Sequence, residues 1–406
     1  MQNNNIPKIR FNGFTAPWEQ RKLTEFVEFF SGLTYTPNDV QKNGTLVLRS
    51  SNVSNGEVVD ADNVYVNPQV VNSKNVKVGD IVVVVRNGSR SLIGKHAQIK
   101  AFMPNTVIGA FMTGIRSECP EFTNALLNTS RFEEEIAMNM GATINQITGY
   151  MFSKMEFKVP CLDEQKKIGS YFANLDRLIT LHQRKYDKLT NVKKSMLEKL
   201  FPKNGASVPK IRFKGFSDAW EQRKLEDVAR ILGGNAWKAS DYSDDGEYLV
   251  VTIANVSGEV IINDSVGNRI SCDNPDVYLL NKGDILVSLT GNVGRVSKMS
   301  NIKGLLNQRV GKILPNNSDI NADFLFHVLR NPHFERAMID AGQGAAQKNI
   351  RNDDVLNYAF FLPVEKDEQN IIAHYFNRLD NLITLHQCKL EKLKHIKQAC
   401  LEQMFL

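Results

Sequence analysis

The stretch DEQKKIGSYFANLDRLITLH, from Asp163 to His182, returns later in the chain as DEQNIIAHYFNRLDNLITLH, from Asp367 to His386. Followed over 39 residues, the two copies are identical at 21 positions, at an offset of 204 residues. An internal repeat has to be recognised first, because it determines how the whole chain is divided. The repeat distance here is long enough for a complete domain together with a connecting segment.

Both copies have the pattern of a long coiled-coil helix. Apolar residues recur at alternating steps of four and three, which is the heptad seam of a coiled coil. About 38 residues at ~1.5 Å each would make a rod of about 55 Å. Two such helices can bury their apolar stripes against each other, and we expect them to run antiparallel. The predicted seam residues are Ile168, Phe172, Leu175, Ile179, His182 and Leu189, and Ile372, Phe376, Leu379, Ile383, His386 and Leu393.

Polar residues also occupy matched positions of this seam. His182 and His386 could form a metal pair or a pH switch, but we favour polar seam residues that fix the register. Lys193 and Lys397 are expected to extend their ammonium groups out of the seam into water. A phosphate contact is the alternative for the two lysines.

A second phrase is repeated at the start of each half. PKIRFNGFTAPWEQRKL, from Pro7, and PKIRFKGFSDAWEQRKL, from Pro209, are identical at 13 of 17 positions. Between this phrase and the helix the copies diverge, so the layout is a variable domain followed by a constant helix, twice. We expect the variable domains to act on different targets, and the large apolar residues of the phrase to pack the joint between helix and domain. These residues are Phe11, Phe14, Trp18 and Leu23, with Phe213, Phe216, Trp220 and Leu225.

The bulk composition narrows the class of protein. A chain of 406 residues has room for two or three domains. A net charge of +6 and a pI near 8.9 are compatible with a polyanionic partner without requiring one. Five scattered cysteines form no CxxC pair, which disfavours a zinc site or disulfide framework and fits a reducing cytoplasm. No apolar run approaches the roughly 18–20 residues of a membrane span, and the N-terminus lacks a signal-peptide core.

Each variable domain combines short β-rich runs with a helical stretch, which predicts a mixed α/β fold. Three polar loops, at 86–100, 290–298 and 342–351, carry Arg, Lys, Asn, Gln and Gly. These side chains read base edges and bind phosphates, although a solvated turn after a buried strand is the alternative. The predicted DNA-binding residues are Arg49, Arg86, Asn87, Ser89, Arg90, Lys95, Asn292, Arg295, Gln343, Gln347, Lys348, Asn349 and Arg351.

The motifs of enzymes that act on DNA are missing or defective. NPHF, from Asn331 to Phe334, resembles the loop of amino-methyltransferases, but His333 replaces its second proline and no Gly-rich cofactor loop follows a strand. GSRSLIGKH, ending at His96, has the wrong spacing for a phosphate loop, and His96 stands where Ser or Thr would bind magnesium. HExxH and GxSxG do not occur. We therefore expect no catalytic residues and no metal site in this chain.

The twofold domain–helix repeat, the DEQ helix starts after Pro160 and Pro363 and the FxGF…WEQRKL openings together resemble the specificity (S) subunits of type I restriction–modification systems. The resemblance covers the whole chain. It implies two target-recognition domains that each read one half of a split double-stranded DNA site, with the helices as a ruler for the gap. It also implies two methyltransferase (M) subunits that use S-adenosylmethionine and two motor-nuclease (R) subunits driven by ATP and magnesium. The S subunit itself would hold no cofactor.

The expected architecture is therefore mixed α/β, with two pseudo-two-fold related target-recognition domains joined by two long antiparallel coiled-coil helices. Two alternatives stay open at this point: a stand-alone DNA-modifying enzyme, and a structural two-headed coiled-coil adaptor that binds proteins. The predicted domain boundaries are 1–160 and 204–363 for the recognition domains, and 161–203 and 364–406 for the helices.

Overall fold

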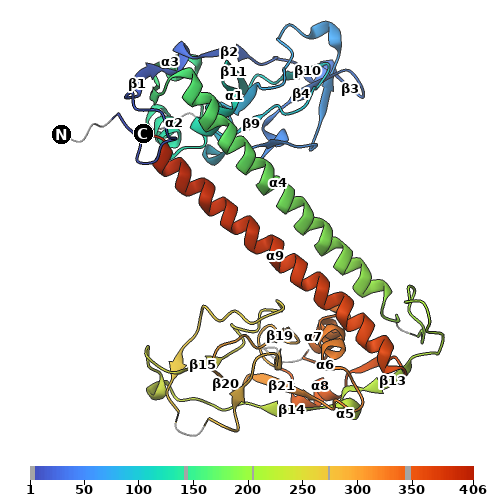
Figure 1. The fold of residues 1–406 in the computed structure, drawn as a ribbon. Coiled ribbons are helices and arrows are strands. Elements are labelled where there is room, and N and C mark those ends of the chain that lie inside the picture. The colour runs from blue at the N-terminus through green and yellow to red at the C-terminus, as the bar shows by residue number, and fades with distance from the viewer. Residues whose placement is uncertain (1–4, 141–144, 204, 273–274, 343–348) are drawn as a thin grey trace. The chain divides into compact units, whose positions relative to one another are not determined.

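The structure is a computed structural model that describes residues 5–140, 145–203, 205–272, 275–342 and 349–406. The chain forms two compact units, Met1–Gln183 with Cys388–Leu406, and Arg184–Gln387 (Figure 1). Two long helices, α4 (Leu162–Lys199) and α9 (Lys366–Met404), each contribute one part to each unit. The boundaries drawn from the sequence treat the helices as segments of their own, and they remain a prediction.

The first unit contains two four-stranded sheets. One is antiparallel, in the order β2-β11-β8-β9, and the other has the order β10-β4-β7-β3, with β10 parallel to β4. A ribbon of β1 and β12 joins the repeated opening phrase to the strand before α4. The strands are β1 (Glu19–Lys22), β2 (Val27–Ser31), β3 (Val40–Gln41), β4 (Thr45–Leu48), β7 (Val64–Val66), β8 (Ile81–Val84), β9 (His96–Gln98), β10 (Thr106–Ile108), β11 (Met112–Ser117) and β12 (Glu156–Val159), with a small hairpin of β5 (Val53–Ser54) and β6 (Glu57–Val58).

The second unit repeats this plan. Its sheets have the orders β14-β21-β18-β19 and β16-β15-β20-β17, with β15 parallel to β20, and a ribbon of β13 and β22. The strands are β13 (Glu221–Lys224), β14 (Ala229–Gly233), β15 (Tyr248–Val251), β16 (Arg269–Ile270), β17 (Leu279–Leu280), β18 (Ile285–Ser288), β19 (Val296–Lys298), β20 (Gly304–Leu306), β21 (Val310–Pro315) and β22 (Ala359–Leu362).

Short helices follow the longest strand of the antiparallel sheet in each unit. Thr129 caps α2 by accepting a hydrogen bond from the Phe132 amide, and Asn321 caps α6 in the same way. The mixed α/β fold class predicted from the sequence is confirmed, with two sheet-rich domains and two long helices. The short helices are α1 (Pro120–Leu127), α2 (Ser130–Asn139), α3 (Gly149–Lys154), α5 (Leu225–Val228), α6 (Ala322–Leu329), α7 (Pro332–Ala341) and α8 (Asn352–Leu356).

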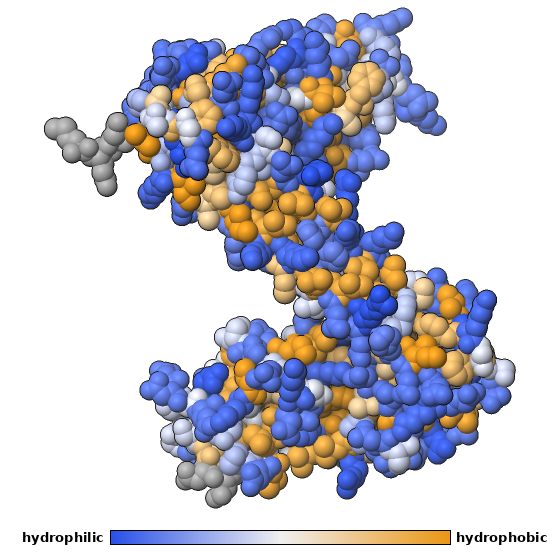
Figure 2. Space-filling model, viewed as in Figure 1, coloured by the Kyte–Doolittle hydropathy of each residue, from blue (hydrophilic) through white to orange (hydrophobic). Residues whose placement is uncertain are grey.

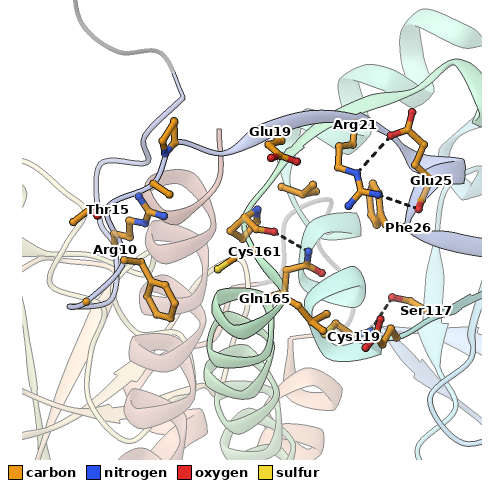
Figure 3. A pocket seen from close by; sticks show the side chains of 18 residues that line it. Arg10, Thr15, Glu19, Arg21, Glu25, Phe26, Ser117, Cys119, Cys161 and Gln165 are labelled. Atoms are coloured by element: carbon orange, nitrogen blue, oxygen red, sulfur yellow. Dashed lines mark hydrogen bonds and ion pairs between the residues drawn. The ribbon is translucent and has the colours of Figure 1, made fainter.

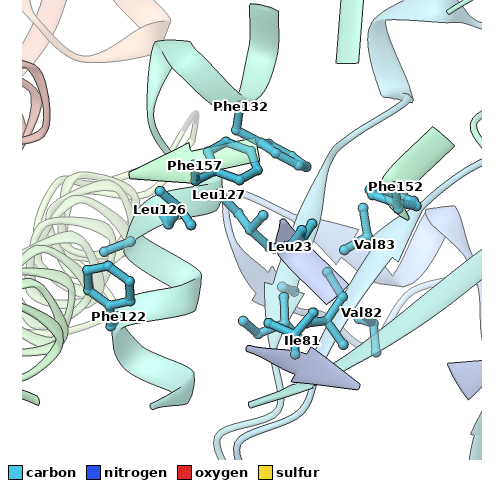
Figure 4. Close-up of a cluster of buried hydrophobic side chains, with 14 of the residues drawn as sticks. Leu23, Ile81, Val82, Val83, Phe122, Leu126, Leu127, Phe132, Phe152 and Phe157 are labelled. Carbon is cyan, nitrogen blue, oxygen red and sulfur yellow. The ribbon is translucent and has the colours of Figure 1, made fainter. Parts of the chain in front are cut away.

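The core of the first unit lies where the antiparallel sheet meets these helices. All four residues of β8 are buried, as suits a β-branched run in the interior of a sheet. Figure 4 shows Val82 and Val83 of this strand with Leu23 of the opening phrase and the aromatic rings of Phe132 and Phe157. The opening phrase therefore contributes directly to the core of the domain that follows it.

In the first unit, the start of α4 packs against the end of α9. The Phe172 ring lies 5.8 Å from the Phe405 ring, Tyr171 hydrogen-bonds Cys400 at 3.4 Å, and Asp176 pairs with Lys397. Since residue numbers rise along one helix as they fall along the other, the two segments run antiparallel. This is the direction that the sequence predicted.

In the second unit, the end of α4 packs against the start of α9. The Phe201 ring stacks on Phe376 at 5.9 Å, and Lys193 pairs with Asp380. These segments are antiparallel too, and the contacts match those of the first unit at the offset of the repeat. Of the predicted seam residues, Ile168, Phe172, Leu175, Ile372, Phe376 and Leu379 are buried, and Ile179, His182, Leu189, Ile383, His386 and Leu393 are half-buried.

The expected geometry of Lys193 and Lys397 is wrong. Their ammonium groups do not extend into water, because each forms an ion pair with an aspartate of the opposite helix segment, Asp380 and Asp176 respectively. Arg330 also reaches Asp380, at 3.1 Å. A heptad pattern identifies the lysine positions but not the acids that face them, because Asp176 and Asp380 stand one residue outside the seam.

The joint between helix and domain is built on the same Arg–Glu pair in both units, although in the second unit Glu368 also accepts a hydrogen bond from the Trp220 indole at 3.1 Å. Arg10 forks onto the buried Glu164 with two bonds of 2.7 Å, and Arg212 forks onto the buried Glu368 at 2.7 and 2.8 Å. A guanidinium and a carboxylate form such paired hydrogen bonds with fixed geometry. Trp18 and Trp220 are almost fully buried beside these pairs, consistent with the predicted packing role.

Candidate nucleic-acid interface

Three segments far apart in the sequence meet beyond β8 in the first domain. They are the loop after β8, the turn between β10 and β11, and the segment that follows α2. The amides of Val85 and Arg86 donate to the Phe111 carbonyl at 3.0 and 3.2 Å, and the Ile147 amide donates to the Val85 carbonyl at 2.8 Å. Arg86 also bridges to Gln146 in the manner of antiparallel strands. We call this set, residues 85–95, 109–111 and 145–147, the first rim.

The second domain has the same arrangement beyond β18. The Leu289 amide donates to the Arg309 carbonyl at 3.0 Å, and the Ile350 amide donates to the Leu289 carbonyl at 2.9 Å. Thr290 bridges to Asn349, as Arg86 does to Gln146. We call residues 289–295, 307–309 and 349–351 the second rim. Two of the loops predicted separately from the sequence, near 290 and 350, thus lie together.

Glycine fixes the shape of the first segment in both rims. Gly94 and Gly294 have positive φ angles of 86° and 78°, a conformation that residues with a side chain rarely adopt. Their amides return to the preceding strand, bonding the carbonyls of Val84 and Ser288 at 2.9 Å. A Cβ at Gly294 would lie 2.7 Å from the Met338 side chain of α7. Each loop is therefore folded tightly between its strand and the helix behind it.

The predicted residues of the first domain lie along the first rim. The Arg86 guanidinium sits over the Phe111 ring at 5.1 Å, and Asn87 donates to the Ser50 hydroxyl at 3.0 Å. That bond ties the loop to the end of β4, where Arg49 is held by Asp62. Ser89, Arg90 and Lys95 are exposed along the remainder of the loop.

His96, the single histidine of the polar stretch 86–100, is buried. Its ring lies 6.2 Å from Phe132 and its Nδ1 lies 3.1 Å from the Gly94 carbonyl oxygen. Burial lowers the pKa of His96, which favours the neutral form of the ring. The basic character of this loop therefore comes from its Arg and Lys residues alone.

In the second domain some of the predicted DNA-binding residues are exposed and others lie near a carboxylate. Asn292 and Asn349 are exposed on the rim. Arg295 approaches Glu335 at 3.9 Å, and Arg351, 84% exposed, approaches Asp354 at 3.8 Å. The predicted residues Gln343, Gln347 and Lys348 lie outside the described residues.

Sequence reasoning missed the middle segment of each rim. Phe111 in the first domain, and Gln308 and Arg309 in the second, are exposed residues of strand turns. Asn145 and Gln146, which bond or bridge to the first loop, were missed as well. An exposed aromatic residue carries no charge signal, and the turn's proximity to the loop depends on sheet order, which the sequence does not reveal.

A cavity of about 650 Å³ lies elsewhere in the first unit, between the opening phrase and the start of α4. Figure 3 shows Arg21 bonded to Glu25, with Cys119, Cys161 and Gln165 also lining the cavity. The Gln165 side chain donates to the Pro160 carbonyl at 2.9 Å. Within the described ranges, no cluster of three His, Cys, Asp or Glu side chains is arranged to hold a metal ion. Among the lining residues, Arg10, Arg21 and Gln165 form ion pairs or hydrogen bonds with neighbouring protein groups.

The surface is predominantly hydrophilic in Figure 2, with apolar residues also reaching it along the long helices. On these helices, Leu178 and Leu181 of α4 are 38% and 45% exposed, and Leu382 and Leu385 of α9 are 36% and 47% exposed. The two pairs occupy matched positions of the repeat. In the part of the chain that the structure describes, no helix is both long and apolar enough to cross a membrane.

Comparison with known proteins gives a consistent result. The profile of the type I restriction modification DNA specificity domain matches residues 16–191 and again 217–395. The MjaVIII specificity subunit of Methanocaldococcus jannaschii is 28% identical over 274 residues, 64% of this chain and 63% of that protein. The putative MjaX specificity subunit of the same organism is 24% identical over 413 residues, 97% and 94% of the two chains. The crystal structure of a type I S subunit from M. genitalium has the same fold, with a TM-score of 0.71 at 14% identity and 99% coverage of both chains.

Proposed function

This chain belongs to the type I restriction modification DNA specificity family, and from that premise we propose that its two rims read the two halves of a split double-stranded DNA site. It is a DNA sequence-recognition subunit, so the chemistry belongs to other subunits. The observation that carries the proposal is the repetition of one rim framework in two domains, with an exposed arginine on both and amide side chains that are half-buried on the first rim and mostly exposed on the second.

The side chains of the rims suit the two kinds of contact that DNA offers. Arginine, asparagine and glutamine form paired hydrogen bonds with base edges in the major groove. Arg90 and Lys95, exposed along the first loop, suit phosphates, which position a protein without reading sequence. Some contacts therefore set register and others set specificity.

The paired helices are proposed to fix the gap between the two half-sites. Two reading domains on one face of a duplex favour half-sites about one helical turn apart, roughly 34 Å. The proposal assigns this spacing to the two long helices. The aromatic clusters at Phe405 and Phe201, together with the ion pairs at Asp176 and Asp380, support it by holding the two helices against each other within each unit.

The chain is proposed to assemble with two methyltransferase subunits and two motor-nuclease subunits. The exposed leucine pairs, Leu178 with Leu181 and Leu382 with Leu385, support docking of the same partner twice. S-adenosylmethionine, ATP and magnesium would be held by those partners. The proposal places the complex in the cytoplasm, where the five free cysteines of this chain stay reduced.

Two measurements test the proposed function. The chain assembled with its methyltransferase subunits should methylate a split sequence, and mapping the methylated adenines would give both half-sites and the gap. Binding to that DNA should weaken steeply with salt, by about one log–log unit for each phosphate neutralised. Salt-insensitive binding would favour the protein-binding adaptor, and methylation by this chain alone would favour the stand-alone enzyme.

A further inference from the structure

The two rims share a backbone framework but differ in the side chains that it presents. Three positions in each rim are matched by the same main-chain bonds, one in each of its three segments. In the first segment Arg86 matches Thr290, in the second Phe111 matches Arg309, and in the third Gln146 matches Asn349. None of the three positions keeps its residue, although the flanking helices keep more than half of theirs.

The two arginines at these positions are available for DNA. Arg49, Arg295 and Arg351 each have a carboxylate neighbour, in Asp62, Glu335 and Asp354. Arg86 and Arg309, by contrast, form no ion pair with any carboxylate of the described residues. Both are exposed. An arginine without a competing acid can give all its donors to a base. Arg90 likewise has no carboxylate partner among the described residues, but it lies outside the three matched positions.

Phe111 prepares Arg86 for such a contact. Its ring is 56% exposed, and the Arg86 guanidinium lies over it at 5.1 Å. Stacking on an aromatic face holds the planar guanidinium in place, so less side-chain entropy is lost when it forms paired hydrogen bonds. The remaining exposed part of the ring is an apolar surface of the kind that contacts the methyl group of thymine.

We propose that these three matched positions are the specificity determinants of each domain, with Arg86 and Arg309 each contacting a guanine and Phe111 contacting a base beside that of Arg86. The inference rests on the proposed function and adds which residues read the DNA. The guanidinium comes from the first segment in one rim and from the second segment in the other. The guanines therefore occupy different places within their half-sites.

Selection from a double-stranded DNA library with a randomised central segment tests this proposal. The full-length chain, assembled with its methyltransferase subunits, would be compared as wild type, Arg86→Ala, Phe111→Ala and Arg309→Ala. Each arginine variant should lose preference at one guanine of one half-site, with discrimination falling about 10- to 100-fold and the other half-site unchanged. Phe111→Ala should lose preference in the half-site that Arg86 reads.

Arg90→Ala provides the matched control, because Arg90 is an exposed arginine of the same loop outside the three positions. It should weaken binding to all selected sequences equally and lower the salt slope by about one.

If the Arg86→Ala complex selected the same two half-sites as wild type, the assignment of Arg86 would be wrong. The proposed function would still stand in that case, because the wild-type complex would have selected a split site. Loss in the same half-site from Arg86→Ala and Arg309→Ala would also overturn the assignment. If the wild-type complex selected no sequence, that result would refute the proposed function and this inference together.

Discussion

The penultimate residue of the chain should be among its most important for stability. Phe405 lies just beyond the end of α9, yet its ring stacks against Phe122 at 5.6 Å, lies tilted to Phe172 at 5.8 Å and packs edge-on against Trp18 at 6.1 Å. Its ring therefore packs against α4, α1 and the opening phrase at once, within the first unit. Replacement of a buried Phe by Ala costs about 3–5 kcal/mol. We expect Phe405→Ala to lower the free energy of unfolding of the first unit by that amount.

Phe201 offers a matched comparison in the second unit. Its ring meets Phe324, Phe376 and Trp220 at 5.7, 5.9 and 6.2 Å, so Phe201→Ala removes the equivalent cluster. Both rings are 8% exposed. Hydrogen exchange of each variant, read peptide by peptide, separates the two units because exchange reports local stability.

The expected result is faster exchange in the first unit for Phe405→Ala and in the second for Phe201→Ala. Urea unfolding followed by circular dichroism would give the matching free energies. A cost below about 1 kcal/mol for either variant, or exchange that rises equally in both units, would refute the reasoning that these rings close two separate cores.

Three further predictions concern charge and connectivity. Burial lowers the pKa of His327 from 6.5 to about 4, so the unfolded chain binds more protons between these values and the second unit should lose about 3 kcal/mol as pH falls through this window. Urea midpoints at several pH values should show this loss in the wild type and in the exposed control His333→Gln, but not in His327→Gln. A permutant joining Leu406 to Met1 and opened at Gly205 should fold and bind DNA, and failure to fold would contradict the matched joints. One heptad inserted into a single long helix should change the methylated gap or abolish methylation, and an unchanged gap would show that the helices are not the ruler.

The internal repeat made most of the fold predictable from a single chain. The heptad seams and their antiparallel packing follow from apolar periodicity, because a helix with an apolar stripe must bury it against something. The residues that pack the joints could be named for the same reason, since Trp18 and Trp220 stand in repeated phrases beside the helices. Because the sequence contains two copies of the helix and of the opening phrase, the pattern of each copy could be checked against the other.

Long-range contacts between polar residues could not be predicted in this way. The pairing of Lys193 with Asp380 depends on how two helices are rotated about their axes, which the seam alone does not determine. The place of Phe111 beside Arg86 depends on the order of strands in two sheets. Sequence therefore located the basic loops, and the structure added the turn that lies beside them.

The rims are held together by main-chain hydrogen bonds and two glycines, and this has an evolutionary consequence. An amino-acid exchange at position 86, 111 or 146 removes none of the main-chain bonds on which the first rim depends. Arg86 and Phe111 are exposed, and exchanges at exposed positions usually change stability by less than about 0.5 kcal/mol. Under the proposed function, such exchanges would alter the DNA preference at little cost to folding, whereas a side chain at Gly94 or Gly294 would strain its loop.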